Sequence, residues 1–107
     1  MDQELNFRNF GAKPDLVLQG DRALSDIGQM IPTCEKLSAS IARLSRGFRC
    51  EIEARILGHS LRAQSESDSP RTALAEAAAE MKNRLMLGRN LSAVLMSHSR
   101  GMGPRFV

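Results

Sequence analysis

Apolar side chains recur every three or four residues between positions 34 and 56, and this is the longest regular pattern in the chain. The positions are Cys34, Leu37, Ile41, Leu44, Phe48, Ile52 and Ile56. At about 100° per residue they fall within one arc roughly 80° wide, which is typical of an amphipathic helix. Thr33, a residue type that favours the N-cap position, precedes the stripe. The pattern therefore predicts a helix over residues 33–63, about 45 Å long.

A second interpretation of this segment stays open, because Gly47 and Gly58 lie within it. A glycine inside a helix costs about 1 kcal/mol relative to alanine. A break at Arg46 and Gly47 would divide residues 33–63 into two shorter helices.

Two further segments show helical periodicity. Leu24, Ile27 and Ile31 share one face of residues 21–31, and Pro32 ends that segment. Residues 71–98 follow a polar loop and a proline, and their stripe consists of Leu74, Ala77, Ala78, Met81, Leu85, Leu95 and Met96. Because a short loop joins two helices of similar length, an antiparallel hairpin is the simplest topology.

The sequence thus predicts an all-α protein, in which a short N-terminal helix accompanies a long antiparallel helical hairpin as a small helical bundle. No segment shows the alternation typical of a strand. We expect a single helical domain over residues 21–99 and a flexible tail over 100–107. Gly11 and Pro14 indicate an irregular arm over residues 1–20.

Each long helix would carry a partial second apolar face that the hairpin does not use. The N-terminal arm and the helix over 21–31 are one possible cover for these faces, and a partner chain is the other. Small helical hairpins bury little surface, which favours association with another protein or with a second copy. The expected partner-binding residues are Cys50, Leu57, Leu61, Leu87, Leu91 and Val94.

His59 has two interpretations. It continues the apolar stripe of residues 33–63, so we favour a half-buried structural histidine. The run from His59 to Ala63 also resembles the phosphoacceptor segment of histidine phosphotransfer domains, which are four-helix bundles that carry phosphate between signalling proteins. The resemblance implies that His59 accepts the phosphoryl group and that the guanidinium of Arg62 neutralises it.

Residues for catalysis or metal binding are missing from the sequence. Cys34, Cys50, His59 and His98 form neither a CxxC nor an HxxxH pair, so zinc binding has no support. The sequence contains no GxGxxG and no GxxxxGK[ST] motif for a nucleotide. We therefore expect no enzymatic activity, no cofactor and no metal.

The formal net charge of +3 raises the question of nucleic acid. The basic residues of the predicted helix over 33–63 are distributed around it, whereas a groove-binding helix concentrates them on one face. This distribution disfavours nucleic-acid binding, and a small DNA-binding regulator remains the third hypothesis after phosphotransfer.

The longest apolar run has four residues, Ala93 to Met96, so we expect no membrane insertion. On one helix Cys34 and Cys50 would lie about 24 Å apart, too far for a disulfide. Reduced thiols and the lack of an export signal indicate the cytoplasm. The sequence thus favours a small non-enzymatic protein, dimeric, that acts as an adaptor, chaperone or regulator by binding a partner's helices.

Overall fold

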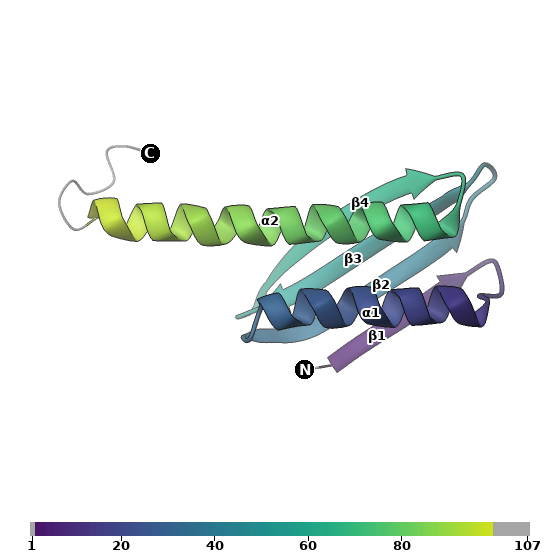
Figure 1. Cartoon of the computed structure of the whole chain (residues 1–107), viewed down its shortest axis with the longest axis horizontal. Coiled ribbons are helices and arrows are strands. Elements are labelled where there is room, and N and C mark those ends of the chain that lie inside the picture. Colours follow the sequence, from purple (N-terminus) through teal and green to yellow (C-terminus); the bar gives the residue numbers. More distant parts are fainter. Residues whose placement is uncertain (1, 100–107) are drawn as a thin grey trace.

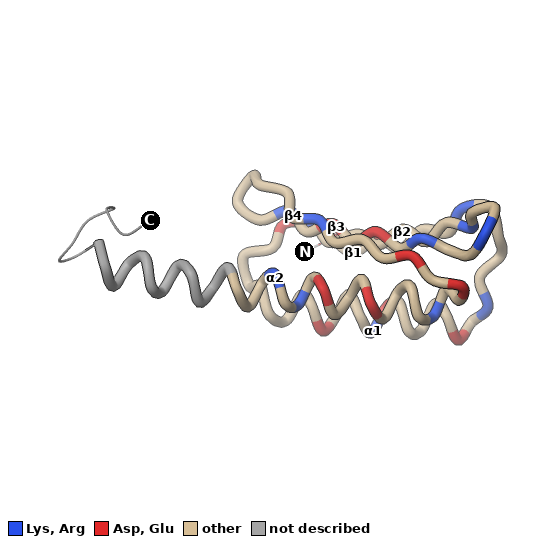
Figure 2. The backbone as a smooth tube through the Cα atoms, turned by 90° about the horizontal axis from the view of Figure 1, so that it is seen from above, with Lys and Arg blue, Asp and Glu red and all other residues tan. Residues whose placement is uncertain are grey.

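The computed structural model describes the backbone of residues 2–99 and the side chains of residues 2–87. Its elements are β1 (Asp2–Arg8), α1 (Pro14–Met30), β2 (Cys34–Arg43), β3 (Phe48–Ile56), β4 (His59–Ser67) and α2 (Pro70–Ser99). The strands form one four-stranded sheet in the order β1-β2-β3-β4. Both helices run across the sheet (Figure 1), and Figure 2 shows that they cover the same face of it. The molecule therefore has two layers, one of helices and one of strands.

The sheet is mixed. β1 pairs with β2 in parallel, so the chain must cross over between them, and α1 is that crossover. β2, β3 and β4 pair antiparallel and are joined by two hairpins. The register aligns Ala39, Ile52 and Ala63 across these three strands, and all three side chains are buried.

Alternating residues of β2 and β3 build the sheet's half of the core. The buried residues are Leu37, Ala39 and Ile41 in β2, with Cys50, Ile52 and Ala54 in β3. The residues between them are polar or charged, apart from Ala42. Because successive side chains of a strand point to opposite faces, one face packs on the helices and the other, called here the open face, meets solvent.

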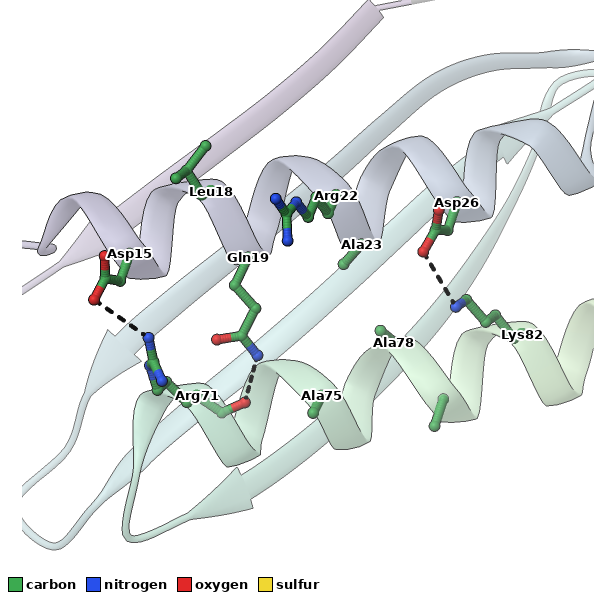
Figure 3. Close-up of a pocket in the computed structure, with 11 residues that line it drawn as sticks. Asp15, Leu18, Gln19, Arg22, Ala23, Asp26, Arg71, Ala75, Ala78 and Lys82 are labelled. Carbon is green, nitrogen blue, oxygen red and sulfur yellow. Dashed lines mark hydrogen bonds and ion pairs between the residues drawn. The ribbon is translucent and has the colours of Figure 1, made fainter.

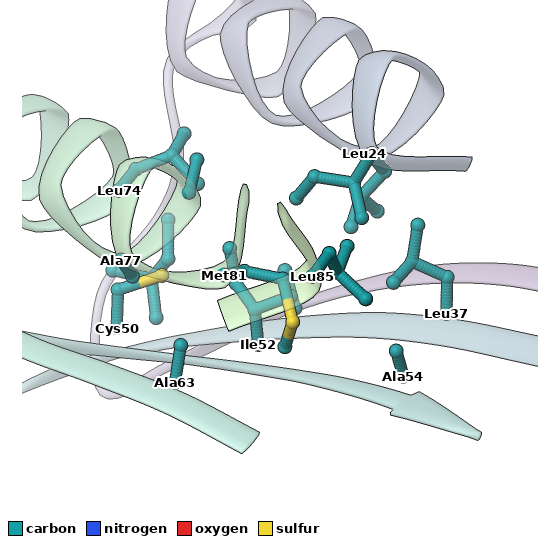
Figure 4. Packing of buried hydrophobic residues seen from close by; sticks show 14 of the residues in the cluster. Leu24, Leu37, Cys50, Ile52, Ala54, Ala63, Leu74, Ala77, Met81 and Leu85 are labelled. Carbon is teal, nitrogen blue, oxygen red and sulfur yellow. The ribbon is translucent and has the colours of Figure 1, made fainter. Parts of the chain in front are cut away.

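The helices supply the other half of the core. α1 buries Leu16, Leu24 and Ile27, and α2 buries a row that includes Leu74 and Met81. Figure 4 shows Leu24, Leu74 and Met81 of the helices facing the side chains of the sheet. Full burial of a Leu or Ile contributes about 1.5 to 3 kcal/mol each, so this layer accounts for much of the stability.

The prediction of an all-α helical hairpin is wrong. The segment predicted as one helix, residues 33–63, forms β2, β3 and most of β4. β1 and the first turns of α1 come from residues 1–20, where the sequence indicated an irregular arm. The helix predicted over residues 71–98 is present as α2. The tail over 100–107 lies outside the described residues, and the limits of the domain itself remain a prediction.

The error has a physical cause. A spacing of four residues, as between Leu37 and Ile41 or between Ile52 and Ile56, fits a helical face and also fits a strand, because four is a multiple of the strand period of two. The glycines that the helical interpretation tolerated are turn residues. Gly47 and Gly58 have φ angles of 83° and 81°, which occur in hairpin turns and not in helices.

Within the described residues, neither helix combines the length and apolarity that a membrane span requires.

Candidate nucleic-acid interface

Three connecting segments lie at one end of the sheet: the β1–α1 loop, the β2–β3 hairpin turn and the β4–α2 loop. Both helices begin at this end (Figure 1). Four basic residues lie here: Lys13 and Arg46 on the connecting segments, Arg43 at the end of β2, and Arg71 in the first turn of α2. These four residues are called the basic end below. Two carboxylates lie at the same end, those of Asp15 in the first turn of α1 and of Asp68 in the β4–α2 loop. Among the described residues, no carboxylate lies within 4.0 Å of the charged groups of Lys13, Arg43 or Arg46.

The β2–β3 hairpin holds Arg43 and Arg46 in place. The Leu44 N–H donates to the Gly47 carbonyl oxygen over 2.9 Å, which closes the turn. The Asn9 side-chain amide donates to the Arg43 carbonyl oxygen over 3.5 Å, so the β1–α1 loop is tied to the hairpin. These backbone contacts leave the two arginine side chains free of the turn's own hydrogen bonds.

Three aromatic rings fix the same two segments against each other. The ring of Phe10 lies edge-on to Phe7 at 5.7 Å and to Phe48 at 5.1 Å between centroids. Such T-shaped pairs stabilise by about 0.5 to 1.5 kcal/mol beyond the area they bury. All three side chains are half-buried, and their rings pack against one another.

The helix starts add a positive field to this end. The N–H groups of Leu16 and Val17 donate to the Lys13 carbonyl oxygen over 3.0 and 3.2 Å as α1 begins. Helix N-termini carry partial positive charge, and here two of them lie at one end. A hollow of about 400 Å³ lies between the two starts, and Phe10, Lys13, Leu16, Ser69 and Arg71 contribute to its lining. The basic end thus favours anions.

Arg71 links the helices. Its guanidinium lies 3.6 Å from the Asp15 carboxylate, and its carbonyl oxygen accepts a hydrogen bond from the Gln19 amide over 3.0 Å. Figure 3 shows both contacts at one end of the groove between α1 and α2. Because both partners of the ion pair are exposed, it contributes at most about 1 kcal/mol to stability.

A hollow of about 640 Å³ lies in the groove between α1 and α2. Ala23, Ala75 and Ala78 line it, and a second ion pair between Lys82 and Asp26, 3.8 Å apart, spans it (Figure 3). Arg22 also lines the groove, and the two carboxylates in it, those of Asp15 and Asp26, are each paired with a basic side chain. The groove therefore has the chemistry of helix packing rather than of an active site.

The open face of the sheet is charged but largely self-paired. Arg49 lies 2.9 Å from Glu66, and Arg62 lies 3.3 Å from Glu53 across the β3–β4 pair. Figure 2 shows basic and acidic residues alternating along the strands. Paired charges of both signs leave this face with little net field, in contrast to the basic end.

Charge is distributed unevenly along the chain. The last charged residues are Arg89, Arg100 and Arg105, and they account for the net charge of +3. Residues 2–87 therefore have a net charge of zero. The positive potential at the basic end arises from the positions of the charged residues and not from an excess of basic ones.

The two cysteines are poor nucleophiles. Burial raises the pKa of Cys50 to about 12, and the charge of Glu51 adds to the effect. Burial also raises the pKa of Cys34, whose thiol donates to the Lys36 carbonyl oxygen over 3.3 Å. A thiol that stays protonated near neutral pH neither attacks a substrate nor binds a metal. No group of three metal-ligand side chains comes together anywhere in the described part.

The structure scatters the residues expected to bind a partner. Cys50 is fully buried and faces the helices, whereas Leu57 is 73% exposed in the turn between β3 and β4. Leu61 is half-buried on β4, and Leu87 is 67% exposed on α2. The side chains of Leu91 and Val94 lie outside the described residues. A partner-binding role for these residues remains a prediction, but they do not form one helical face.

His59 and Arg62 lie on β4 and not on a helix. His59 is exposed beside the Leu57–Gly58 turn, and the guanidinium of Arg62 is paired with Glu53. The helical setting of a phosphotransfer domain is thus missing, and phosphate acceptance by His59 remains a prediction.

Sequence reasoning missed the basic end. The basic residues of 33–63 would be distributed around a single helix, but on strands the same residues are placed differently. A turn signal was present, since Ser45, Arg46 and Gly47 form a polar, glycine-ended connection between two segments that contain apolar residues.

The fold is a two-layer α/β fold in which two helices cover one face of a mixed four-stranded sheet. No family model matches the sequence, and no curated protein matches it either. Solved structures do match. A ribosomal subunit interface protein from Coxiella burnetii has a TM-score of 0.72 and 13% identity over 84% of this chain and 99% of that one. The Protein Y N-terminal domain from Thermus thermophilus has a TM-score of 0.68 and 16% identity, over 79% and 96%. At these identities the likeness is one of fold.

Proposed function

We propose that this protein is a non-catalytic factor that binds structured RNA in a ribosomal particle through its basic end. The observation that carries the proposal is the placement of Lys13, Arg43 and Arg46 without ion-pair partners beside the starts of both helices. Phosphate groups are the ligands that such an arrangement attracts, and phosphate contacts supply most of the affinity in RNA binding.

The similarity of fold supports the ribosome as the RNA-containing partner. One structural neighbour is titled a ribosomal subunit interface protein, and a fold shared over nearly its whole length makes the same kind of partner the first to test. Such a factor would act in the cytoplasm.

The aromatic residues favour folded RNA over single strands. Proteins that bind single-stranded RNA stack its bases on exposed aromatic rings. Phe7, Phe10 and Phe48 pack on each other instead. A basic end without stacking platforms suits the phosphate backbone of double-helical RNA, which proteins recognise by shape.

A non-enzymatic role fits the same residues. The buried thiols are protonated near neutral pH, and the groove between α1 and α2 is lined by alanines and paired charges. The side chains of the basic end are donors of hydrogen bonds, and the Asp15 carboxylate beside them is paired with Arg71.

A protein component of the particle is the second candidate partner. It is favoured by the exposed Leu57 and Leu87, which offer apolar surface away from the basic end. Leu57→Asp would then weaken binding, while charge reversal at the basic end would leave it unchanged.

The test is co-sedimentation of the purified protein with ribosomal subunits from its own cells. Arg43→Glu with Arg46→Glu should weaken binding by at least about tenfold, because two phosphate contacts become repulsive. The matched control is Lys36→Glu with Arg55→Glu, which changes the net charge equally at the other end of β2 and β3. Equal losses in both variants would contradict the proposal, and so would binding that does not weaken as salt rises.

A further inference from the structure

The two edges of the sheet differ. α2 covers part of the β4 edge, because the Glu80 carboxylate accepts from the Gln64 backbone N–H over 3.2 Å and Glu76 accepts from the Ser65 hydroxyl over 2.8 Å. β1 forms the opposite edge and pairs on one side only, with β2. Within the described part of the chain, no strand or hydrogen bond from another element covers its outer side.

β1 is a regular edge strand. Its seven residues, DQELNFR, include no proline, and they pair with β2 without a bulge. Proteins commonly protect an exposed edge strand with proline, a bulge or charged side chains, and of these β1 has only its charges, on Asp2, Glu4 and Arg8. Because these charges have both signs, they repel some strands and are complementary to others.

We propose that β1 pairs antiparallel with β1 of a second copy of this chain, with Leu5 of both copies on the two-fold axis. This register follows from charge. It places Asp2 opposite Arg8 of the second copy and Glu4 opposite Asn6 of the second copy at both ends of the pair. Opposite charges facing each other across strands are stabilising, and like charges are destabilising. β1 is thus complementary to itself in this orientation.

The apolar residues of β1 agree with the same register. Leu5 and Phe7 point toward the helices and are half-buried. Directly opposed residues of an antiparallel pair share a face, so Leu5 would meet Leu5 of the second copy on the helix side. α1 crosses close above this point, since a Cβ at Gly20 would lie 2.6 Å from Cδ2 of Leu5. Two sheets would then become one, with all helices on one side.

The chemistry of this interface is independent of RNA binding. It uses the edge of β1, whereas Lys13 and Arg46 lie on loops and Arg43 is the last residue of β2. A monomeric protein that still co-sediments with ribosomal subunits would overturn the dimer alone, and a dimer that ignores ribosomal subunits would overturn the proposed function alone.

The experiment is a charge swap followed by sedimentation equilibrium over a concentration series, with any purification tag at the C-terminus because β1 begins at residue 2. Asp2→Arg and Arg8→Asp each place like charges opposite each other twice per dimer, so each should weaken self-association by about tenfold or more. The double variant restores opposite charges and should recover the wild-type dissociation constant. An equimolar mixture of the two single variants should likewise form a heterodimer.

Both positions are exposed, so the fold should survive in each variant, and circular dichroism checks this. A wild-type protein that stays monomeric throughout the concentration series overturns the proposal. So does a dimer that both single variants leave intact, or a double variant that remains as weak as the singles.

Discussion

Gly47 in the β2–β3 turn lies directly against the backbone of Ser67 at the end of β4. A Cβ placed on Gly47 would lie 2.6 Å from the Ser67 carbonyl oxygen, and the φ angle of Gly47 is 83°. Two independent restrictions, one of space and one of conformation, therefore require glycine here. The contact fixes the hairpin that carries Arg43 and Arg46 against β4, the edge strand paired with β3.

Gly47→Ala should lower the free energy of unfolding by roughly 2 to 3 kcal/mol, because it adds a backbone clash to the cost of a left-handed residue. Gly58→Ala is the matched control. Gly58 has a φ of 81° but nothing within 4 Å of its Cβ position. The control should lose about 1 kcal/mol. Urea denaturation measures both, and equal losses would mean that the contact with Ser67 contributes nothing.

Leu57→Asn should stabilise the protein by about 0.5 to 1 kcal/mol, because asparagine tolerates left-handed backbone that strains leucine. Leu57 has a φ of 50° and is 73% exposed, so the substitution removes strain and little packing. Leu61→Asn should instead destabilise, since Leu61 packs against the core. Thermal unfolding of the two variants compares them, and a destabilised Leu57→Asn would assign Leu57 a packing role.

The sequence predicts the helix α2 correctly, but it does not predict the strands β2 and β3. The helix over 71–98 was found, because Leu74, Ala77, Met81 and Leu85 repeat only at helical spacing. In β2 and β3 the large residues Leu37, Ile41, Ile52 and Ile56 satisfy both periods, and the small residues Ala39, Cys50 and Ala54 decide between them. Small buried residues carry a weak hydrophobic signal, so the alternation was missed.

The basic end was less accessible to sequence reasoning for a different reason. Lys13, Arg43 and Arg46 lie up to about thirty residues apart and meet only because β2 pairs with both β1 and β3. The long-range register that brings loops together cannot be read from local periodicity. Charges that look scattered on a helix become clustered when strands return the chain to the same end.

Stability should fall as the pH rises above the ordinary range of a thiol. The pKa of Cys50 in the folded protein is about 12. An unfolded thiol has a pKa of about 8.5. As the pH rises, the Cys50 thiol therefore loses its proton at a lower pH in the unfolded state than in the folded state. Between these values the free energy of unfolding should decrease by about 1.4 kcal/mol per pH unit from this group.

Urea denaturation from pH 7 to pH 10 checks the thiol's contribution. Cys50→Ala should be less stable than the wild type at pH 7, because it leaves a cavity, but its stability should decline less steeply with pH. If the stability of the two proteins declined equally with pH, the Cys50 thiol would have the same pKa in the folded and the unfolded state, which contradicts the prediction.

The most direct test of the RNA-binding proposal is photo-cross-linking from a single position at each end of the sheet. Ser45→Cys and Ser60→Cys introduce exposed thiols, and the native Cys34 and Cys50 are buried, so a maleimide–benzophenone reagent should label the new thiol selectively at neutral pH. Each labelled protein is then irradiated with ribosomal subunits. The account predicts cross-links to ribosomal RNA from position 45, in the turn between Arg43 and Arg46, and few or none from position 60. Cross-links to RNA from position 60 alone, or to protein alone from both positions, would contradict it.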